Sequence, residues 1–481
     1  MKDNKNKFNY NRIDKIKILN DNGIDPYPSE CNNKKNNLEI KNSFNYIQHG
    51  DVVNKKVEIF GRIMRIRDMG KAMFLDVQDG YSKIQIYANK SIMQDYNLFK
   101  SIIDISDIVS ILGVPFRTKT NEFSILVNTW RILTKSLLPL PEKWHGLRDI
   151  ETRYRKRHLD LIMNSNVKHL FIKRSILINA LRSKLIELGF IEVETPILQS
   201  IAGGANAKPF ITHHNSLNED LFLRISPELF LKRVIIGGID KIFEIGKSFR
   251  NEGIDKTHNP EFTMLEIYQA YANYKDMMNL AEILIKTAAK AVNSNVNLVF
   301  REACMFDLIK QYTGVYLLPY IENKQELLKQ ISHLNLNISS NMTNKKLLEK
   351  IFDEKILPNL QSPFFITDYP AIYSPLAKKK QTNLKLAERF EIYINKLEIG
   401  NAYSELNDPI VQKTNFTEQV NNKSYSEDQI ISSYDNDFIS ALEQGLPPTG
   451  GLGIGIDRLI MVLTETESIK DVILFPTLKS E

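Results

Sequence analysis

The first third of the chain contains five short runs in which apolar and polar residues alternate or β-branched residues cluster. Such runs predict strands, and they cover residues 57–65, 72–78, 83–87, 109–114 and 124–132. Gly70 and the Asp79-Gly80 pair supply turns between the early runs, and residues 91–103 have helical spacing. Five strands with one helix after the third have the element order of an OB barrel, although another small barrel or a sandwich would fit the same pattern.

Beyond residue 138 the pattern becomes a mixture of helices and strands. Helices are expected at 167–188 and 276–292, and strand-like runs at 221–225, 241–245 and 363–368. This order is typical of an α+β domain rather than of regular βαβ repeats. We therefore predict an α+β multidomain chain. Its parts are an N-terminal extension at 1–52 with a helix near 12–22, a barrel at 53–135, a linker at 136–160, and a larger domain at 161–481 with a helical insertion around 293–358.

The composition narrows the class of protein only a little. The chain has 481 residues, of which 43% are hydrophobic and 25% charged, an ordinary globular balance. No apolar run is long enough to cross a bilayer, and the basic N-terminus lacks the apolar core of a secretory signal. Cys31 and Cys304 are the only cysteines, so a disulfide framework is excluded and a reducing, cytoplasmic location is expected. The net charge of +6 permits a nucleic-acid partner without requiring one.

A polar segment between two apolar runs carries the first group of candidate functional residues. Phe249-Arg-Asn-Glu252 is followed by His258-Asn-Pro-Glu-Phe262 and then by Glu266 and Tyr268. We expect a strand, a loop and a second strand, with Arg250 and Glu252 on one strand face and Glu266 and Tyr268 on one face of the next. There an arginine could clamp a phosphate and a phenylalanine could stack on a base. An exposed, ion-paired hairpin would give the same pattern.

A glycine-rich run near the C-terminus, Gly450-Gly-Leu-Gly-Ile-Gly-Ile-Asp457-Arg458, precedes an apolar stretch that is compatible with a helix. It is not a phosphate-binding P-loop, because no Lys-Ser/Thr follows, and it lacks the spacing of a dinucleotide fingerprint. Glycines allow the backbone to approach a ligand or a neighbouring strand closely. Arg458 would then lie near a helix start, a position that suits a bound phosphate.

A third segment is rich in acidic residues. Glu391 and Glu398 are candidate hard-oxygen ligands for Mg²⁺, which in proteins usually takes one or two carboxylates together with substrate phosphates. Asn401, Tyr403 and Glu405 alternate and would share one strand face. Solvated acidic residues on a strand would give a similar sequence.

Together these segments resemble the signature motifs of class II aminoacyl-tRNA synthetases, in the expected order. Gly189-Phe-Ile-Glu-Val-Glu-Thr-Pro196 is similar to motif 1, which forms the dimer interface in that family; residues 249–262 are similar to motif 2 and residues 451–458 to motif 3. The OB-like unit is similar to that of subclass IIb, whose members charge lysine, aspartate or asparagine. The stretches 203–215, 249–274 and 398–408 most resemble the lysine enzymes of bacterial type. The resemblance implies a class II catalytic domain, an antiparallel sheet flanked by helices.

For ATP, the resemblance implies a role for each matching residue. Arg250 would bridge the lysine carboxylate and the α-phosphate, and Arg458 would hold the γ-phosphate, so these two are the catalytic candidates. Phe262 would stack on adenine. Residues near the nucleotide would be Glu252, His258 and Asn259, and Glu391 with Glu398 would bind Mg²⁺ against the phosphates.

For lysine, the resemblance and the residue types agree. Carboxylates and phenols are acceptors suited to a ligand with two ammonium groups, whereas a site for aspartate would need a cation facing the side-chain carboxylate. The implied lysine-binding residues are Gly204 and Glu228 at the α-amino group, Arg250 and Asn401 at the carboxylate, Glu405 with Tyr268 at the ε-ammonium, and Glu266 and Tyr403 beside them.

In the OB unit, the resemblance implies that Phe74 and Gln85 contact the central anticodon uridine, with Arg67 as a further contact. Stacking a splayed base on an aromatic ring is the usual means of recognising single-stranded RNA. Phe74 could instead belong to the barrel core. The partners implied are tRNA(Lys), lysine, ATP and a second copy of the chain in a homodimer, with no membrane.

A few residues depart from the family pattern. Lys208 stands where arginine is expected and Ala402 where glycine is expected, and neither change removes a proposed catalytic group. The pair His213-His214 has no nearby third ligand for a metal. The alternatives left open are an aspartyl- or asparaginyl-tRNA synthetase, a related enzyme that lysylates a translation factor, and a non-catalytic RNA-binding protein on a synthetase scaffold.

Overall fold

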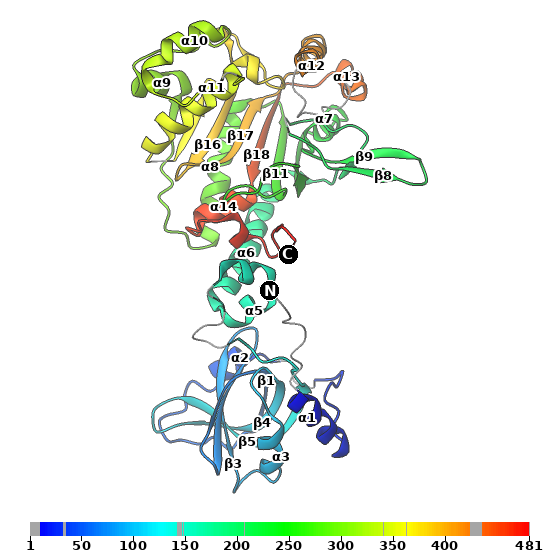
Figure 1. Cartoon of the computed structure of the whole chain (residues 1–481), viewed down its shortest axis with the longest axis vertical. Helices are drawn as coiled ribbons and strands as arrows, with labels where there is room; N and C mark the ends of the chain where they lie inside the picture. Colours follow the sequence, from blue (N-terminus) through cyan, green and yellow to red (C-terminus); the bar gives the residue numbers. More distant parts are fainter. Residues whose placement is uncertain are drawn as a thin grey trace. The chain divides into compact units, whose positions relative to one another are not determined.

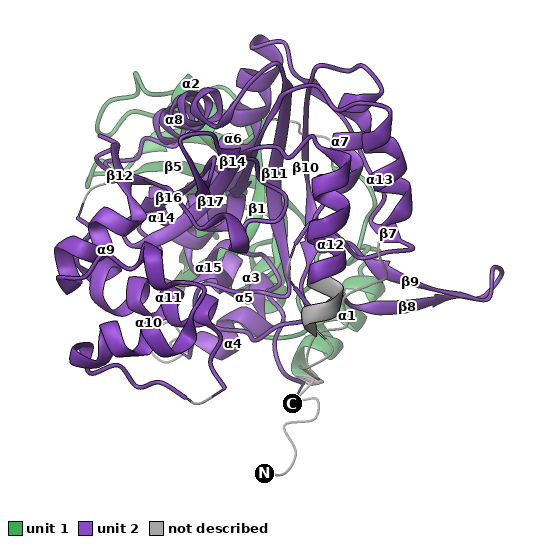
Figure 2. Cartoon of the chain, turned by 90° about the horizontal axis from the view of Figure 1, so that it is seen from above, with its two compact units in different colours: residues 1–148 green, residues 149–481 purple. Residues whose placement is uncertain are grey.

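The computed structural model describes residues 10–31, 35–141, 147, 149–205, 207–339, 341–361, 363–423 and 435–480. The chain divides into two compact units, residues 1–148 and residues 149–481, which Figure 2 shows in different colours. Within the described ranges, no helix combines the length and the apolarity that a membrane crossing requires.

The first unit contains a closed barrel of five strands. Neighbouring strands follow the order β1, β2, β3, β5, β4, and β3 pairs with β5 in parallel. One helix, α3, lies between β3 and β4 in the sequence, so the expected OB architecture is confirmed. The bounds are β1 Val57–Asp68, β2 Ala72–Gln78, β3 Lys83–Asn89, α3 Tyr96–Ile102, β4 Ile108–Arg117 and β5 Phe123–Thr134.

Two helices that precede the barrel, α1 Tyr10–Asp21 and α2 Asn37–Ser43, pack against it. Leu19 of α1 and Ile40 of α2 are buried in the same apolar cluster as the barrel core. At one end of the barrel, the buried Lys135 Nζ lies 2.7 Å from Asp107 Oδ2, and Arg12 of α1 donates to Ser136 O at 2.9 Å. The described part of the N-terminal extension is therefore a constituent of this folded unit.

The second unit is built on an eight-stranded sheet in the order β12-β13-β16-β17-β18-β11-β10-β6 (Figure 1). Inner neighbours are antiparallel, as expected, whereas the pairs at the two edges, β6 with β10 and β12 with β13, are parallel. The bounds are β6 Ile191–Glu192, β10 Lys241–Phe249, β11 Glu261–Ala270, β12 Arg301–Cys304, β13 Phe364–Thr367, β16 Arg389–Ile394, β17 Leu397–Ser404 and β18 Thr449–Gly455.

Helices and two small sheets surround this central sheet. The helices are α4 Ile150–Arg155, α5 Arg157–Met163, α6 Ser165–Glu187, α7 Glu228–Ile236, α8 Tyr274–Ala291, α9 Met305–Thr313, α10 Lys324–Ile331, α11 Asn344–Ile351, α12 Pro409–Lys423, α13 Asn436–Glu443, α14 Ile456–Leu463 and α15 Ile469–Val472. The small sheets pair β14 Lys379–Lys380 with β15 Asn383–Ala387, and β7 Leu198–Gln199 with β9 Glu219–Leu223 and β8 Ile211–His214. In Figure 1 the hairpin β8–β9 extends away from the body of the second unit.

The predicted insertion at 293–358 contains helices and one strand of the main sheet. Phe306 of α9, Leu327 of α10 and Leu347 of α11 belong to one apolar cluster, which also includes Ile366 of β13 and Tyr393 of β16. The strand β12, which lies in the same segment, pairs with β13 and so extends the sheet at its edge.

Alternation along the central strands sorts their side chains onto two faces. Leu265 and Ile267 of β11, Ala402 of β17, and Leu452 and Ile454 of β18 are buried in the core that includes α6, α8 and α14. The residues between them face the other way, where α7 packs on the sheet. Most polar candidates from β11, β17 and β18 lie on this second face, so the pattern that builds the core also gathers the site.

Candidate active site

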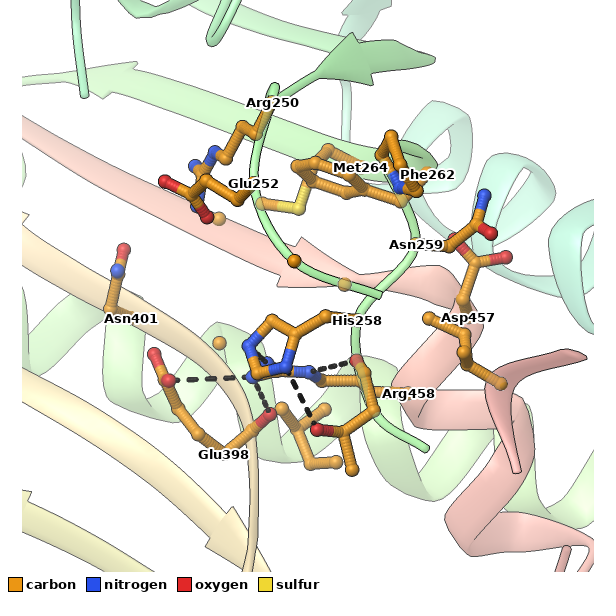
Figure 3. Close-up of a pocket in the computed structure, with 18 residues that line it drawn as sticks. Arg250, Glu252, His258, Asn259, Phe262, Met264, Glu398, Asn401, Asp457 and Arg458 are labelled. Carbon is orange, nitrogen blue, oxygen red and sulfur yellow. Dashed lines mark hydrogen bonds and ion pairs between the residues drawn. The ribbon is translucent and has the colours of Figure 1, made fainter. Parts of the chain in front are cut away.

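A pocket opens where the loop between β10 and β11, the strands β17 and β18 and the first turn of α14 meet (Figure 3). The predicted site residues that line it are Arg250, Glu252, His258, Asn259, Phe262, Glu398, Asn401 and Arg458. Phe262 and Met264 provide apolar surface, and the two arginines provide positive charge. This combination suits a ligand with a flat aromatic part and several anionic groups.

The expectation that Arg250 and Glu252 lie on a strand is wrong. β10 ends at Phe249, because the following backbone turns: Arg250 N–H donates to Pro260 O at 2.8 Å, and Glu252 N–H donates to Arg250 O at 2.9 Å. The turn nevertheless brings both residues to the pocket. The guanidinium carbon of Arg250 lies 5.1 Å from the centre of the Phe262 ring. Its Nε is buried and has no hydrogen-bond partner in the described part of the chain.

Arg458 lies in the first turn of α14 and is held by groups that a phosphate could replace. Its guanidinium donates to Glu398 O at 2.9 Å and lies 2.9 Å from Nε2 of His258, and Figure 3 marks both interactions. On the other side of the ring, His258 Nδ1 lies 2.9 Å from Asp255 Oδ2. Although partial burial opposes the charged form, hydrogen bonds from Thr257 and His258 hold the pKa of Asp255 down at about 2.

The residue before Arg458 anchors this turn. Asp457 is buried and accepts the Thr263 N–H of β11 at 2.7 Å, and it pairs with Arg174 of α6 at 2.7 Å. Our reading of the sequence missed Arg174, because a single arginine in a long amphipathic helix carries no signal of its buried partner. The ion pair holds the start of α14 against α6, and the hydrogen bond holds it against β11.

The candidate metal ligands Glu391 and Glu398 lie on adjacent strands but differ in position. Glu398 lines the pocket, whereas Glu391 does not and accepts hydrogen bonds from Tyr369 at 2.7 Å and Tyr393 at 2.9 Å, with Arg389 at 2.5 Å. Burial, followed by the negative charge of Glu391, raises the pKa of Glu398 above its usual range. The Glu398 side chain is 37% exposed, and two carboxylates that repel each other at the edge of a pocket are well suited to sharing a cation.

A second cluster, the acid cluster, consists of Glu228, Glu266 and Glu405 and is buried on the same face of the sheet. Glu266 Oε2 accepts the Tyr268 hydroxyl at 3.2 Å, and Ser226 Oγ lies 3.4 Å from its other oxygen. Burial, then the charge of Glu228, raises the pKa of Glu266 to about 8.

The other lysine-site candidates surround the acid cluster. The backbone of Gly204 has φ +83°, and a Cβ there would lie only 3.1 Å from Glu228 Cβ, so glycine permits this close approach. The Tyr403 hydroxyl donates to Asn401 Oδ1 at 3.3 Å. Glu405 comes one residue after the end of β17, so its predicted place in the strand alternation is corrected. It nevertheless faces Gly451 and shares the cluster with Glu228 and Glu266.

A lysine that sequence reasoning missed lies inside the acid cluster. Lys232 of α7 is fully buried, with Nζ 2.6 Å from Glu228 Oε1 and 2.5 Å from Glu405 Oε2. The spacing of Glu228 and Lys232, four residues apart on a helix, was the available signal. Their contact with Glu405 could not be predicted, because it depends on how α7 packs on the central sheet.

On the barrel, Arg67, Phe74 and Gln85 lie close together. Phe74 is only partly buried and alternates with the buried Met73 and Leu75 of β2, so its side chain is not part of the barrel core. The Arg67 guanidinium carbon lies 5.5 Å from the Phe74 ring centre, and Arg67 donates to Gln85 Oε1 at 2.6 Å. Gln85 itself is buried, which leaves the aromatic ring and the arginine as the accessible groups.

The two residues that depart from the family pattern, Lys208 and Ala402, do not line the pocket. Ala402 is buried on the core face of β17, and the backbone oxygen of Lys208 accepts the Asn251 N–H at 2.7 Å. His213 pairs with Asp220 at 2.8 Å. No group of three or more metal-binding side chains occurs among the residues that the structure describes.

Comparison with known proteins gives matches along nearly the whole chain. A family model described as class II tRNA synthetases (D, K and N) matches residues 149–479, and one described as an OB-fold nucleic acid binding domain matches residues 57–133. The chain is 45% identical to lysine–tRNA ligases of Thermoanaerobacter pseudethanolicus (97% of this chain, 95% of the relative) and Clostridium botulinum strain Langeland (98% and 95%). It is 42% identical to that of Dehalococcoides mccartyi, over 98% of this chain and 97% of the relative.

Proposed function

The chain belongs to the class II lysine–tRNA ligases, and from this premise we propose that it activates lysine with ATP and then transfers it to the 3′-terminal ribose of tRNA(Lys). One observation supports this function above others: the acid cluster Glu228, Glu266 and Glu405 lies on the same sheet face as a pocket lined by Arg250 and Arg458. An acidic site for an ammonium-bearing substrate beside a cationic site for a triphosphate is the arrangement that this ligation requires.

Lysine binds with its two ammonium groups toward the acid cluster. Gly204 and Glu228 take the α-amino group, and Glu405 with Tyr268 takes the ε-ammonium. Glu266 and Tyr403 complete the wall, and Asn401 helps Arg250 hold the carboxylate. In support, Gly453 separates Asn401 from Glu266 with no side chain of its own, since a Cβ there would lie 3.7 Å from each. The lysine carboxylate can therefore face the pocket while the ammonium groups stay in the acid cluster.

ATP binds in the pocket with adenine against Phe262 and with Glu252, His258 and Asn259 beside the nucleotide. Asn259 is fixed for this role, because its Nδ2 donates to Glu261 O at 2.6 Å and its Oδ1 accepts the Thr477 N–H at 3.3 Å. Arg458 binds the γ-phosphate. Its present partners include a backbone carbonyl and a histidine ring, and a phosphate is a stronger acceptor than either.

In the first step a lysine carboxylate oxygen attacks the α-phosphorus, the bond from that phosphorus to the bridging oxygen breaks, and pyrophosphate leaves. Arg250 stabilises the charge that grows on the α-phosphate, in support of which its side chain lines the pocket. In the second step a ribose hydroxyl of tRNA attacks the lysyl carbonyl and AMP leaves. No covalent bond to the protein forms, so the residues act by positioning and by charge.

Glu398 and Glu391 fit a bound Mg²⁺. The two carboxylates are hard-oxygen donors whose mutual repulsion raises the pKa of Glu398 on top of its burial, and a divalent cation would relieve that repulsion. Bound there, Mg²⁺ would neutralise phosphate charge. Glu398, which lines the pocket, would then bind the ion directly. Glu391, which accepts hydrogen bonds from Tyr369 and Tyr393, would add a second negative charge beside it.

The remaining parts of the proposal concern partners. Arg67 and Phe74 on the outer face of the barrel bind the anticodon of tRNA(Lys), with Gln85 held between Arg67 and Ser124. The chain forms a homodimer through the motif 1 elements, where Ile172, Ile191 and Ile211 leave apolar surface exposed. The enzyme acts in the cytoplasm, in line with an exposed free thiol at Cys31.

The test is amino-acid-dependent exchange of pyrophosphate into ATP, measured without tRNA for all twenty amino acids in the presence of Mg²⁺. We expect exchange with lysine alone. Exchange with aspartate or asparagine would keep the reaction and refute the assignment of the acid cluster to lysine. A folded protein that exchanges with no amino acid would refute the catalytic proposal.

A further inference from the structure

Lys232 occupies an unusual place for a lysine side chain. It extends from α7 into the acid cluster with no exposed surface, and its Nζ lies within ion-pair distance of Glu228 and Glu405. The ring of Phe438 from α13 lies on one side, with its centre 5.9 Å from Nζ. Burying a charged ammonium is costly unless it is paired. Among the residues that the structure describes, Lys232 meets this condition through Glu228 and Glu405, two residues that the proposed function assigns to the substrate.

We propose that Lys232 is a positioning residue for lysine recognition: its ion pair with one oxygen of Glu405 orients the carboxylate so that the other oxygen faces the ε-ammonium of the substrate. The inference rests on the proposed function, because it assumes that lysine is the ligand of the acid cluster.

The two carboxylate oxygens of Glu405 have different surroundings, which supports one role for each: an ion pair with Lys232 and a contact with the substrate. Oε2 lies 2.5 Å from Lys232 Nζ. Oε1 is buried and has no hydrogen-bond partner among the residues that the structure describes. It lies against Gly451, where a side chain would collide with this oxygen, and the Tyr268 ring flanks the same glycine. A buried, unpartnered carboxylate oxygen is costly in an empty site, and a substrate ammonium would satisfy it.

The groups around Glu405 explain why it needs a cation from the protein. Glu228 from α7, Glu266 and Tyr268 from β11, and Tyr403 from β17 share its surroundings. Burial most of all, with the charges of Glu228 and Glu266, raises the pKa of Glu405, and Lys232 opposes this rise by its charge and hydrogen bond. Lys232 itself stays charged, since Glu228 and Glu405 outweigh its burial and raise its pKa to about 12.

The total charge of the site supports the same assignment. The three carboxylates of the acid cluster face two protein cations, Lys232 and Arg250, when all are ionised. Once bound lysine has displaced the proton of Glu266, the site carries one net negative charge, which matches the one net positive charge of lysine at neutral pH. Without Lys232 the site would be more negative, and the pKa of Glu405 would rise further, so that this carboxyl group would keep its proton to a higher pH. A protonated Glu405 would no longer favour an ammonium over an uncharged side chain.

The experiment compares the full-length wild-type enzyme with Lys232→Met and Lys232→Arg, using lysine-dependent pyrophosphate exchange between pH 6.5 and 9.5. Methionine keeps the length of the side chain without its charge, and arginine keeps the charge. For Lys232→Met we expect the KM for lysine at pH 7 to rise roughly tenfold or more, since a shift of one pKa unit changes the ionised fraction about tenfold. This KM should recover toward the wild-type value as pH rises, while the KM for ATP changes less than twofold. Lys232→Arg should restore most of the pH 7 affinity.

The controls separate this inference from simple loss of structure and from failure of the proposed function. Lys286→Met, at an exposed position of α8, should leave both KM values unchanged. If Lys232→Met does not fold, Lys232→Met/Glu228→Gln removes the buried pair together, and its pH profile should lie to the alkaline side of that of Glu228→Gln alone. Unchanged KM values and pH profiles in these variants would overturn the role of Lys232. A wild-type enzyme inactive with lysine would instead overturn the proposed function.

Discussion

Glu266 is buried between Ser226 and Tyr268, and its pKa of about 8 makes lysine binding depend on pH. In the free enzyme near pH 7 this carboxyl group mostly carries a proton. The ammonium groups of a bound lysine favour the ionised form, so binding releases that proton and the affinity should rise with pH until about pH 8. Calorimetry at pH 7 in buffers of different ionisation heat should therefore detect proton release.

The matched variant for this prediction is Glu266→Gln, which cannot release the proton. It should lower the number of protons released by up to one and flatten the rise in affinity between pH 7 and pH 8. Equal proton release in the wild type and in this variant would show that another group titrates.

Arg458 is the residue whose removal should separate catalysis from amino-acid binding. In Arg458→Ala the γ-phosphate loses its cation, so we expect kcat for lysine-dependent pyrophosphate exchange to fall roughly 10²- to 10³-fold, the usual effect of losing one such donor. Lysine binding without ATP should stay within about twofold, because Arg458 does not contact the acid cluster. Arg301→Ala, on the exposed side of β12, is the control. Full exchange activity in Arg458→Ala would exclude its assigned role.

For single residues, the sequence indicates which side chains could act in the site more reliably than it indicates which groups surround them in the fold. The alternation of Glu266 and Tyr268 could be predicted, because both lie within one regular strand. Arg250 was placed on a strand wrongly, since the end of β10 depends on hydrogen bonds with Pro260, ten residues later. Lys232 could not be assigned, because an i, i+4 pair with Glu228 is common on exposed helices and only its tertiary contact with Glu405 distinguishes it.

Among the elements, β18 is the strand that gives the site its shape. Gly451 pairs with Tyr268 of β11 on one side and with Tyr403 of β17 on the other, so no side chain stands between these two tyrosines on the sheet. A methyl group on Gly451 would collide with Glu405 Oε1 and lie 2.8 Å from the Tyr268 ring. Glu405 cannot easily move away, because Lys232 holds its other oxygen.

We therefore expect Gly451→Ala to weaken lysine binding roughly 10- to 100-fold, the cost of losing a hydrogen bond to a charged group, with little change in the affinity for ATP. Gly453→Ala is the comparison, because its added methyl group would meet the flexible end of Met264 at 3.3 Å. It should weaken lysine binding less. Calorimetric titration with each ligand checks both variants, and equal loss of lysine affinity in the two would contradict the specific collision with Glu405.

The elements themselves could largely be predicted from periodicity. The five barrel strands and the helices α6 and α8 were expected within a few residues of their observed bounds, because each has a continuous apolar face. The strand β12 was not expected, since Arg301–Cys304 has little apolar character and depends on β13 for its pairing. The parallel pairing of the strands at the two sheet edges could not be predicted either, because pairing between segments that are far apart in the sequence leaves no local pattern of residues.

At the scale of the whole molecule, each unit has its own core. The barrel core includes Leu19 and Ile40 from the segment that was expected to be a separate extension. Helices such as α1 have weak sequence signals, because only one or two of their residues are buried. The assignment of the N-terminal segment therefore required the tertiary structure, whereas the OB barrel itself did not.

The homodimer that we propose would form through exposed apolar side chains of the second unit. Ile172 and Ile176 of α6 are 46% and 43% exposed and lie four residues apart, so they share one face of the helix. Further exposed apolar residues of the motif 1 region are Ile191, Ile197, Leu198 and Ile211. Several neighbouring apolar side chains on a surface are typical of an interface, since leaving them in water is unfavourable.

The last prediction follows from this surface. Ile172→Lys/Ile176→Lys should convert a dimer into a monomer, because two charges on each copy would be desolvated and would face each other across a symmetric contact. The control is Ile283→Lys, since Ile283 is 43% exposed but belongs to α8 and not to α6 or motif 1. Sedimentation should give about twice the mass of one chain for the wild type and the control, and the mass of one chain for the double variant. If the double variant stays dimeric, the second copy binds through another surface, and these isoleucines have to be explained by a different contact.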